Sequence, residues 1–358
     1  MSKKPLFDKD IEILDLSGRN LSELPTEVGK LSKLKVLFLS NNPFKEIPKE
    51  IIKLQNLRFL GMKSCNISNL SENSLPESLE WLTLTDNKIT KLPKSIKKLT
   101  NLRKLLLAGN QISVLPDEML NCQNIELMRI SANRFTKSPI SLIKNLSKLS
   151  WYSDSGNPFS VKNDSDINHF DYSEIKLDSI ISQNAKNIIY KVTFNNNKYA
   201  LKVFSGIVNS DGYIVDEVQI CAGLKKHPNI IETNGIVDGA PNNQMAMLME
   251  LVPESYKKLS DPPSFETCTR DVYPQGISFT DNIAKKILDG VKKSLSHMHK
   301  FNISNGDVYG HNILFDLEGN IKLGDFGAAT KYGDDEKGIR EEMDLRALRI
   351  LSDELMAN

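Results

Sequence analysis

The sequence predicts a multidomain chain of α/β and α+β type, with a solenoid of short parallel strands in the first half and an α+β domain in the second. Three observations carry this prediction. Leucines recur about every 23 residues in the first half, strand and helix patterns alternate in the second, and the charge changes sign between them. Residues 1–165 carry 25 Lys and Arg against 17 Asp and Glu, giving +8, whereas residues 166–358 carry 21 against 28, giving −7. We therefore place a domain boundary near residue 160.

The composition is that of an ordinary globular protein, with 40% hydrophobic and 25% charged residues. No apolar run approaches the roughly 20 residues needed to span a bilayer, and the N-terminus lacks an apolar stretch typical of a secretory signal. The four cysteines are far apart in the sequence, which favours reduced thiols and a cytoplasmic location. Because the basic residues of the first half are scattered, we expect no nucleic-acid binding.

The first half contains copies of an L-x-x-L-x-L pattern followed by asparagine. The second leucine of each copy stands at Leu14, Leu37, Leu60, Leu82, Leu105, Met128 and, in a seventh copy, Tyr152. The pattern resembles leucine-rich repeats, with six to seven copies over residues 1–160. The resemblance implies that each copy supplies one strand to a shared core and that its buried asparagine bonds to neighbouring turns.

Strand positions beside the core leucines face the concave side of such an array, and many carry large apolar side chains. Large apolar residues on an exposed face usually mark a contact surface. We therefore expect a protein substrate or partner to bind Phe38, Phe59, Trp81, Leu106, Leu127 and Trp151. Two alternatives remain open: the row packs against the second domain, or it reflects only strand propensity.

Residues 161–173 are rich in Ser, Asn and Asp and are interpreted as a linker, so that the second domain covers residues 174–358. Hydrophobic periodicity and turn residues predict its elements. These are a hairpin over residues 191–204, a helix through 214–222, a strand over 244–252 and a helix over 280–300. Thr280 or Asp281 is the predicted N-cap of the last helix.

Two motifs follow that helix, with Asp307 and Asn312 five residues apart in the first and Asp325-Phe326-Gly327 in the second. Together they resemble the catalytic loop and the metal-binding loop of protein kinases. Further upstream, Ala200-Leu201-Lys202 resembles the family's lysine strand, and Glu217 lies on the helix that follows it.

The resemblance implies a bilobal kinase fold that uses ATP and Mg²⁺. It assigns Asp307 as the catalytic base, Lys202 to the α- and β-phosphates, Glu217 as the ion-pair partner of that lysine, and Asn312 and Asp325 to the metal. The remaining nucleotide contacts fall on the adenine hinge at Glu250 and Val252 and on the phosphate-covering turn at Ser182, Asn184 and Asn187.

The second half departs from the kinase pattern in four ways. Ser182, Asn184 and Asn187 stand where glycines are expected, which should weaken or reshape nucleotide binding. The usual His-Arg before the catalytic Asp is Asn305-Gly306, and the usual Lys after it is Tyr309. The C-terminal lobe is expected to be truncated, because no A-P-E motif follows Asp325 and only 185 residues are available from position 174.

Three functions from different classes fit these residues. We favour an atypical protein kinase, assumed to act on Ser and Thr, whose repeats dock the substrate or partner. The alternatives are a pseudokinase scaffold and a small-molecule phosphotransferase. Retention of the charged residues argues against the scaffold, and the repeat array argues against a small-molecule substrate. The identity of the partner and the oligomeric state are not predicted by the sequence.

Overall fold

The computed structural model describes residues 7–161, 167–184, 187–276 and 278–357. Its contacts divide the chain into two compact units. The first comprises Met1–Phe159 and Pro263–Thr269, and the second comprises Ser160–Pro262 and Arg270–Asn358. No sequence pattern predicts the assignment of Pro263–Thr269 to the first unit.

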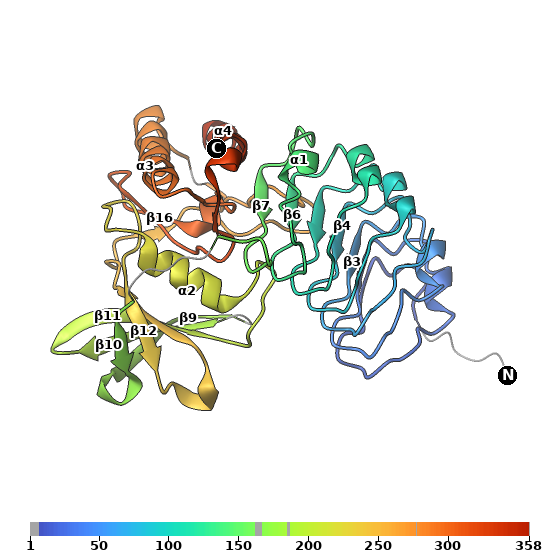
Figure 1. The fold of residues 1–358 in the computed structure, drawn as a ribbon, viewed down its shortest axis with the longest axis horizontal. Helices are drawn as coiled ribbons and strands as arrows, with labels where there is room; N and C mark the ends of the chain where they lie inside the picture. The colour runs from blue at the N-terminus through green and yellow to red at the C-terminus, as the bar shows by residue number, and fades with distance from the viewer. Residues whose placement is uncertain (1–6, 162–166, 185–186, 277, 358) are drawn as a thin grey trace. The chain divides into compact units, whose positions relative to one another are not determined.

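The first unit is a ladder of seven parallel strands that pair in chain order, as Figure 1 shows. The strands are β1 (Ile13–Asp15), β2 (Val36–Phe38), β3 (Phe59–Gly61), β4 (Trp81–Thr83), β5 (Lys104–Leu106), β6 (Leu127–Arg129) and β7 (Trp151–Ser153). Each central residue pairs with the central residue of the next strand, so Leu37 lies beside Leu60 and Leu60 beside Leu82. These leucines are almost completely buried. The predicted solenoid of parallel strands is confirmed.

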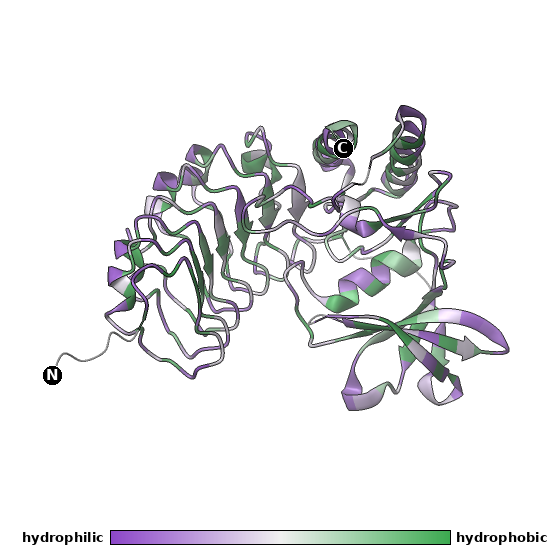
Figure 2. Ribbon diagram, turned by 180° about the vertical axis from the view of Figure 1, so that it is seen from behind, coloured by the Kyte–Doolittle hydropathy of each residue, from purple (hydrophilic) through white to green (hydrophobic). Residues whose placement is uncertain are grey.

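Short helices follow most of the strands on the opposite side of the ladder (Figure 1). They are η1 (Val28–Lys30), η2 (Ile51–Lys53), η3 (Lys94–Lys98), η4 (Asp117–Asn121) and α1 (Ile140–Ile143). Residues 62–80, between β3 and β4, form no helix. Coloured by hydropathy, the strands are predominantly hydrophobic and the helices carry polar residues, as Figure 2 shows. The core therefore lies between the sheet and the helices.

Buried asparagines connect successive repeats through their amide groups. Asn110 donates to the carbonyl oxygens of Leu84 and Leu107, both at 2.9 Å, and accepts from the Ile89 amide at 3.0 Å. Asn87 and Asn133 make the same set of bonds one repeat earlier and one repeat later. The asparagine thus satisfies backbone groups that have no strand partner.

Replacing Asn110 by alanine is expected to lower the free energy of unfolding by about 2–4 kcal/mol, because two carbonyls and one amide lose their buried partner. Asn101→Ala is the matched control, since Asn101 is exposed and bonds only a turn carbonyl among the described residues. Urea denaturation of the two variants measures the difference. Equal destabilisation would mean that the asparagine ladder does not hold the repeats together.

The second unit begins with a six-stranded sheet in the order β8-β12-β13-β11-β10-β9. Its strands are β8 (His169–Asp171), β9 (Lys176–Gln183), β10 (Asn187–Phe194), β11 (Asn197–Phe204), β12 (Thr233–Asp238) and β13 (Ala246–Glu250). All neighbours are antiparallel except β8 and β12. Asn195 and Asn196, with φ of 47° and 62°, join β10 to β11. Two left-handed residues suit a two-residue hairpin turn, and the predicted hairpin is confirmed.

The helix α2 (Ile214–Gly223) lies over this sheet (Figure 1). Two longer helices, α3 (Asp281–His299) and α4 (Lys337–Ala357), pack on each other. The Thr280 side chain caps α3 by accepting from the Ile283 amide at 3.4 Å, as predicted. The remaining elements are short: η5 (Tyr172–Glu174), η6 (Pro241–Asn243), β14 (Lys257–Lys258), β15 (Ile303–Ser304), η7 (Gly310–Asn312), β16 (Ile313–Phe315), β17 (Ile321–Leu323), β18 (Thr330–Lys331) and η8 (Asp334–Glu336).

The linker prediction is wrong for residues 169–171, which form the edge strand β8. Ile236 to Asp238 pair with this strand in parallel, and the His169 ring bonds Asp238 at 2.7 Å. A three-residue strand at a sheet edge is too short for hydrophobic alternation to reveal it. Residues 162–166 of the predicted linker lie outside the described residues.

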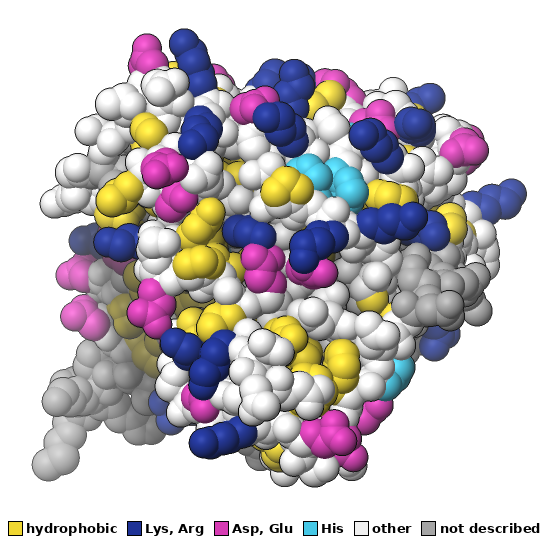
Figure 3. Space-filling view, turned by 90° about the vertical axis from the view of Figure 1, so that its left-hand side faces the viewer, with side chains coloured by type: hydrophobic (Ala, Val, Ile, Leu, Met, Phe, Trp, Pro, Cys, Tyr) yellow, Lys and Arg dark blue, Asp and Glu magenta, His cyan; other side chains and the backbone are white. Residues whose placement is uncertain are grey.

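One face of the second unit carries charged side chains of both signs. On the face in Figure 3, Lys and Arg side chains are interspersed with Asp and Glu. None of the helices in the described part of the chain is long and apolar enough to cross a membrane.

Candidate active site

A buried ion pair joins the central strand β11 to the helix α2. Lys202 Nζ lies 2.6 Å from Glu217 Oε1, and both residues are buried. Lys202 follows the apolar run that pairs with β10 and β13, and Glu217 lies in the first turn of α2, so the backbone fixes both ends. Removing a charge pair from water costs free energy, and buried charged groups of this kind are concentrated at functional sites.

A second carboxylate completes the cluster. Asp325, just after β17, places Oδ1 3.5 Å from Lys202 Nζ. Burial opposes the ammonium charge, but Asp325 and Glu217 outweigh it and raise the pKa of Lys202 above its ordinary value. Asp325 has φ of 54°, an uncommon value for a residue with a Cβ. Such strained backbone is concentrated at functional sites.

The segment 305–312 brings Asp307 and Asn312 together. Asn312 Nδ2 donates to Asp307 Oδ2 at 2.8 Å and to the Asp307 carbonyl at 3.0 Å. The Gly324 amide, next to Asp325, donates to the Asn312 carbonyl at 3.0 Å. The two predicted motifs are therefore held side by side, with Asp325 linking them to Lys202.

Asp344 on α4 anchors this segment from below. Its carboxylate accepts from the backbone amides of Asn305 at 2.8 Å and Gly306 at 2.9 Å, and from His299 Nε2 at 2.8 Å. Asn305 Oδ1 in turn accepts from the Asp307 amide at 2.9 Å. Asp344 lies within α4 (Lys337–Ala357), and only the fold reveals these bonds.

A second buried carboxylate holds the other end of the segment. Asp271 accepts from Ser260 Oγ at 2.7 Å and from the His311 amide at 3.0 Å, and it bonds His311 Nδ1 at 2.7 Å. A Cβ on Gly310 would meet Ser260 Oγ at 2.6 Å, so a larger residue there would displace the Ser260 side chain. Asp271 lies in an irregular loop, and no sequence signal identifies it.

The predicted hinge and phosphate-covering residues lie on the sheet. Val252 is half-buried just beyond β13, and the Glu250 carboxylate bonds Lys322 Nζ at 2.6 Å. Ser182 on β9 lies opposite Ile189 on β10. Asn184 and Asn187 bond each other, with the Asn187 amide donating to Asn184 Oδ1 at 3.0 Å. The turn is thus tied by asparagine where the family uses glycines; residues 185–186 lie outside the described residues.

The residues predicted to bind a partner differ in exposure from the prediction. Phe59, Leu106, Leu127 and Trp151 are buried, and Phe38 and Trp81 are half-buried. Phe265, from the segment that returns to the first unit, lies against Phe38, Phe59 and Trp81. Sequence reasoning does not identify Phe265, because it is separated from its partners by more than 180 residues.

The donors near Lys202 suit magnesium. Asp325 offers a carboxylate, and the Asn312 amide nitrogen is turned to Asp307, which leaves the amide oxygen for a cation. Mg²⁺ prefers oxygen ligands and is commonly bound by one or two side chains together with substrate phosphates. In the described part of the chain, no cluster of three His, Cys, Asp or Glu could hold a metal unaided.

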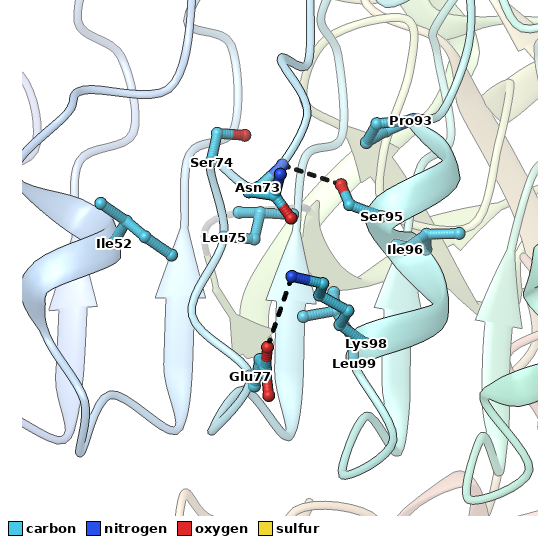
Figure 4. A pocket seen from close by; sticks show the side chains of 10 residues that line it. All are labelled: Ile52, Asn73, Ser74, Leu75, Glu77, Pro93, Ser95, Ile96, Lys98 and Leu99. Carbon is cyan, nitrogen blue, oxygen red and sulfur yellow. Dashed lines mark hydrogen bonds and ion pairs between the residues drawn. The ribbon is translucent and has the colours of Figure 1, made fainter.

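A separate pocket of about 250 Å³ lies in the first unit, beside the repeat that forms no helix (Figure 4). Its charged residues, Lys98 and Glu77, pair at 3.9 Å, and Ser95 Oγ accepts from the Asn73 amide at 2.9 Å. The rest of its lining is largely apolar. The pocket therefore offers none of the chemistry found around Lys202.

Glu354 near the end of α4 is expected to make stability depend on pH. Burial and the nearby Asp271 raise the pKa of its carboxyl from 4.5 to about 7. The protonated form is thus favoured in the folded state, and its stabilising contribution is complete below about pH 4.5 and is lost as the pH rises through about 7.

Glu354→Gln should remove about 1–2 kcal/mol of this pH-dependent loss, after allowance for partial exposure. Urea denaturation at about pH 5 and pH 8 measures the change, with Asp353→Asn as the control because Asp353 is exposed on the same helix. An unchanged difference between the two pH values in the Glu354→Gln variant would contradict the assignment.

Comparison with known proteins finds two family matches, one in each half of the chain. Residues 183–347 match the family model of the protein kinase domain, and residues 9–67 and 77–135 match that of the leucine rich repeat. Serine/threonine-protein kinase GRIK1 of Arabidopsis thaliana is 26% identical over 165 residues, which cover 43% of this chain and 38% of that protein. Cyclin-dependent kinase 11.1 of Caenorhabditis elegans is 31% identical over 118 residues, covering 33% and 15%.

A solved leucine-rich-repeat protein of Leptospira interrogans is similar with 30% identity and a TM-score of 0.38, covering 42% of this chain and 44% of that one. The chain spans 38% and 15% of the length of the two curated relatives.

Proposed function

Because this chain carries N-terminal leucine-rich repeats followed by a C-terminal protein kinase domain, we propose that it transfers the γ-phosphoryl group of ATP to hydroxyl groups of proteins. Serine and threonine are the proposed acceptors, in line with the name of its relative in Arabidopsis thaliana. The observation that carries the proposal is the buried Lys202–Glu217 pair, with Asp325 3.5 Å from the lysine. A role in binding phosphates would account for the costly burial of this lysine.

Phosphate binding falls to Lys202. Its ammonium group neutralises the α- and β-phosphates, and Glu217 fixes its direction from α2. Glu250 ends β13 and Val252 lies just beyond it, where the adenine would lie, and Lys322 holds the Glu250 side chain. The turn at Ser182, Asn184 and Asn187 covers the phosphates from β9 and β10, with amide side chains in place of glycines.

Asn312 and Asp325 are the residues that would hold magnesium, which when bound neutralises charge on the transferred phosphoryl group. The chain's contribution is to keep the two side chains in register, since the Gly324 amide bonds the Asn312 carbonyl. Phosphoryl transfer depends mainly on such positioning.

Asp307 orients the acceptor hydroxyl and takes its proton. The hydroxyl oxygen forms a bond to the γ-phosphorus while the bond to the β,γ-bridging oxygen breaks, so that ADP leaves and the proton resides on the Asp307 carboxylate. Asn312 and the Asn305 side chain hold Asp307 from two sides. Asp344 fixes the backbone that precedes it.

The repeats are proposed to dock the protein substrate or partner. Arrays of this kind present extended concave surfaces that suit macromolecular ligands. This role separates the proposal from transfer to a small molecule, for which a repeat array has no use.

A nucleotide-binding scaffold without catalysis is the second candidate, and Tyr309 favours it. The family's cation at this position is replaced by a tyrosine that is 3% exposed and whose ring lies tilted against that of His311, with ring centroids 4.9 Å apart. A neutral ring does not stabilise charge on the γ-phosphoryl group.

The test is transfer of labelled γ-phosphate from magnesium–ATP to the protein itself and to a cell lysate. Asp307→Asn should lower labelling by about a thousandfold or more, because the acceptor loses its base and its orientation. Asp335→Asn, at an exposed aspartate, should retain wild-type labelling. Bound ATP without label would support the scaffold, and label only in small molecules would support the phosphotransferase.

A further inference from the structure

Residues Pro263–Thr269 of the kinase half belong to the first unit. The segment reads Pro-Ser-Phe-Glu-Thr-Cys-Thr, and the flanking residues Pro262 and Arg270 belong to the second unit. The chain thus leaves the second unit for seven residues and then returns to it. Such a segment is stable there only if its contacts with the repeats offset the conformational entropy that it loses on ordering.

One end of the segment is held by an aromatic cluster on β2, β3 and β4. The ring centroid of Phe265 lies 5.1 Å from that of Phe59, 5.5 Å from Phe38 and 5.9 Å from Trp81. The interplanar angles with the two phenylalanines are 68° and 62°, an edge-to-face arrangement that aromatic rings prefer. The Phe265 ring therefore has a defined seat on the concave face.

Gly61 makes room for this seat. A Cβ at Gly61 would lie 3.0 Å from the Phe59 ring and 3.4 Å from the Phe38 ring. Lys104 on β5 closes the far side, with Nζ 3.8 Å from the centre of the Trp81 ring. Gly61 therefore leaves space for the aromatic rings, and Lys104 places a cation over the Trp81 ring.

The other end of the segment is held by polar groups from the next repeats. Arg103 Nη2 donates to Thr269 Oγ1 at 2.7 Å and to Glu126 Oε2 at 3.1 Å. The Thr269 hydroxyl also donates to Glu126 Oε2. Thr269 is completely buried, and its hydroxyl accepts one of these hydrogen bonds and donates the other.

Hydrogen bonds within the segment hold it as a turn between these two anchors. Ser264 Oγ accepts from the amides of Glu266 and Thr267, and Thr267 Oγ1 accepts from the Ser264 amide at 2.9 Å. The Cys268 amide closes the turn on the Ser264 carbonyl at 2.9 Å. A turn that is ordered before binding loses less entropy on binding.

We propose that the concave face of the repeats is a binding site for a protein turn that carries an aromatic residue and, four residues later, a threonine, and that residues 263–269 occupy this site in cis. A protein partner with the same chemistry would compete with the chain's own turn. The proposal rests on the docking role assigned to the repeats, but it does not involve ATP or phosphoryl transfer. It commits to Phe265 and Thr269 as the two anchors and to Phe59 and Glu126 as their receptors.

A capped, fluorescent peptide of residues 263–269, with Cys268→Ser to prevent disulfide formation, is the probe. It is titrated without ATP into the full chain and into the Phe265→Ala chain. We expect at least tenfold tighter binding to the Phe265→Ala chain, because its own turn has lost the aromatic anchor. The same peptide with Phe265→Ala should bind neither chain. Phe279→Ala, an aromatic residue elsewhere in the same connection, should leave peptide binding as weak as in the wild type.

Thr269→Val is the second variant, and it keeps the size of the side chain while removing the hydroxyl. It should raise peptide affinity by a smaller factor than Phe265→Ala, and adding Phe59→Ala to either variant should abolish the gain. Equal affinity for wild type and both variants, or no binding to any, would overturn the proposal. A wild-type dimer that becomes monomeric in the Phe265→Ala chain would also overturn it, since the turn would then occupy the repeats of a second copy.

The two proposals fail separately. Loss of labelling in the kinase assay with intact peptide competition would leave the docking site standing. Normal labelling without peptide competition would leave the kinase assignment standing and remove only the docking site.

Discussion

Replacing Lys202 by methionine is expected to lower the affinity for magnesium–ATP by about a hundredfold or more. The ammonium group is the buried cation that faces Glu217 at 2.6 Å and Asp325 at 3.5 Å. Without it, two carboxylates would face the phosphates without compensation. Loss of one partner of a buried charge pair typically costs about 2–5 kcal/mol, which corresponds to this range of affinity.

Titration calorimetry measures the change, and circular dichroism verifies that the variant folds. Lys198→Met is the matched control, because Lys198 lies on the same strand but is exposed and pairs with Asp178 at the surface. Glu217→Gln provides a milder variant that keeps the side-chain shape and a hydrogen bond to the lysine. Unchanged ATP binding by Lys202→Met would place the nucleotide site elsewhere.

Replacing Asp344 by alanine should damage both the fold and the catalytic rate, although Asp344 is proposed to touch no substrate. Its buried carboxylate accepts three hydrogen bonds, from His299, Asn305 and Gly306. Loss of these partners is expected to lower the free energy of unfolding by about 3–4 kcal/mol. Displacement of Asp307 by about 1 Å should lower the rate by about a hundredfold.

The two effects are separated by measuring the rate below the temperature at which the variant unfolds. Asp353→Ala, on the exposed side of the same helix, should change neither stability nor rate. Asp344→Asn, which retains one acceptor oxygen, should recover part of both. If folded Asp344→Ala protein had the same catalytic rate per molecule as the wild type, the segment 305–312 would hold its conformation without Asp344.

Much of the fold was predictable because it is determined by local patterns. Each repeat carries its own leucines and asparagine, so the strand positions follow from the sequence one repeat at a time. The hairpin at Asn195-Asn196 and the helix capped by Thr280 also depend on neighbouring residues alone. In the second unit, the motifs around Lys202 and Asp325 predicted the residues of the candidate site.

The features that could not be predicted depend on contacts between distant parts of the chain. Phe265 and Thr269 lie in a short polar stretch, and their contacts with the repeats become visible only in the folded structure. Asp271 is one aspartate in an irregular loop, yet it holds His311 at 2.7 Å. The strand β8 exists because β12 offers it an edge. None of these residues stands in a periodic pattern, and periodicity is what sequence reasoning can detect.

The repeat without a helix has a mechanical consequence for the array. The strands form one continuous ribbon from β1 to β7, whereas the outer layer is interrupted where residues 62–80 replace a helix and leave the hollow between Ile52 and Ile96. Solenoids are stabilised by contacts between nearest neighbours. The array therefore consists of two blocks, β1 to β3 and β4 to β7, which share a sheet but not a continuous layer of helices. At the hollow between them, the first three repeats can loosen while the last four stay folded.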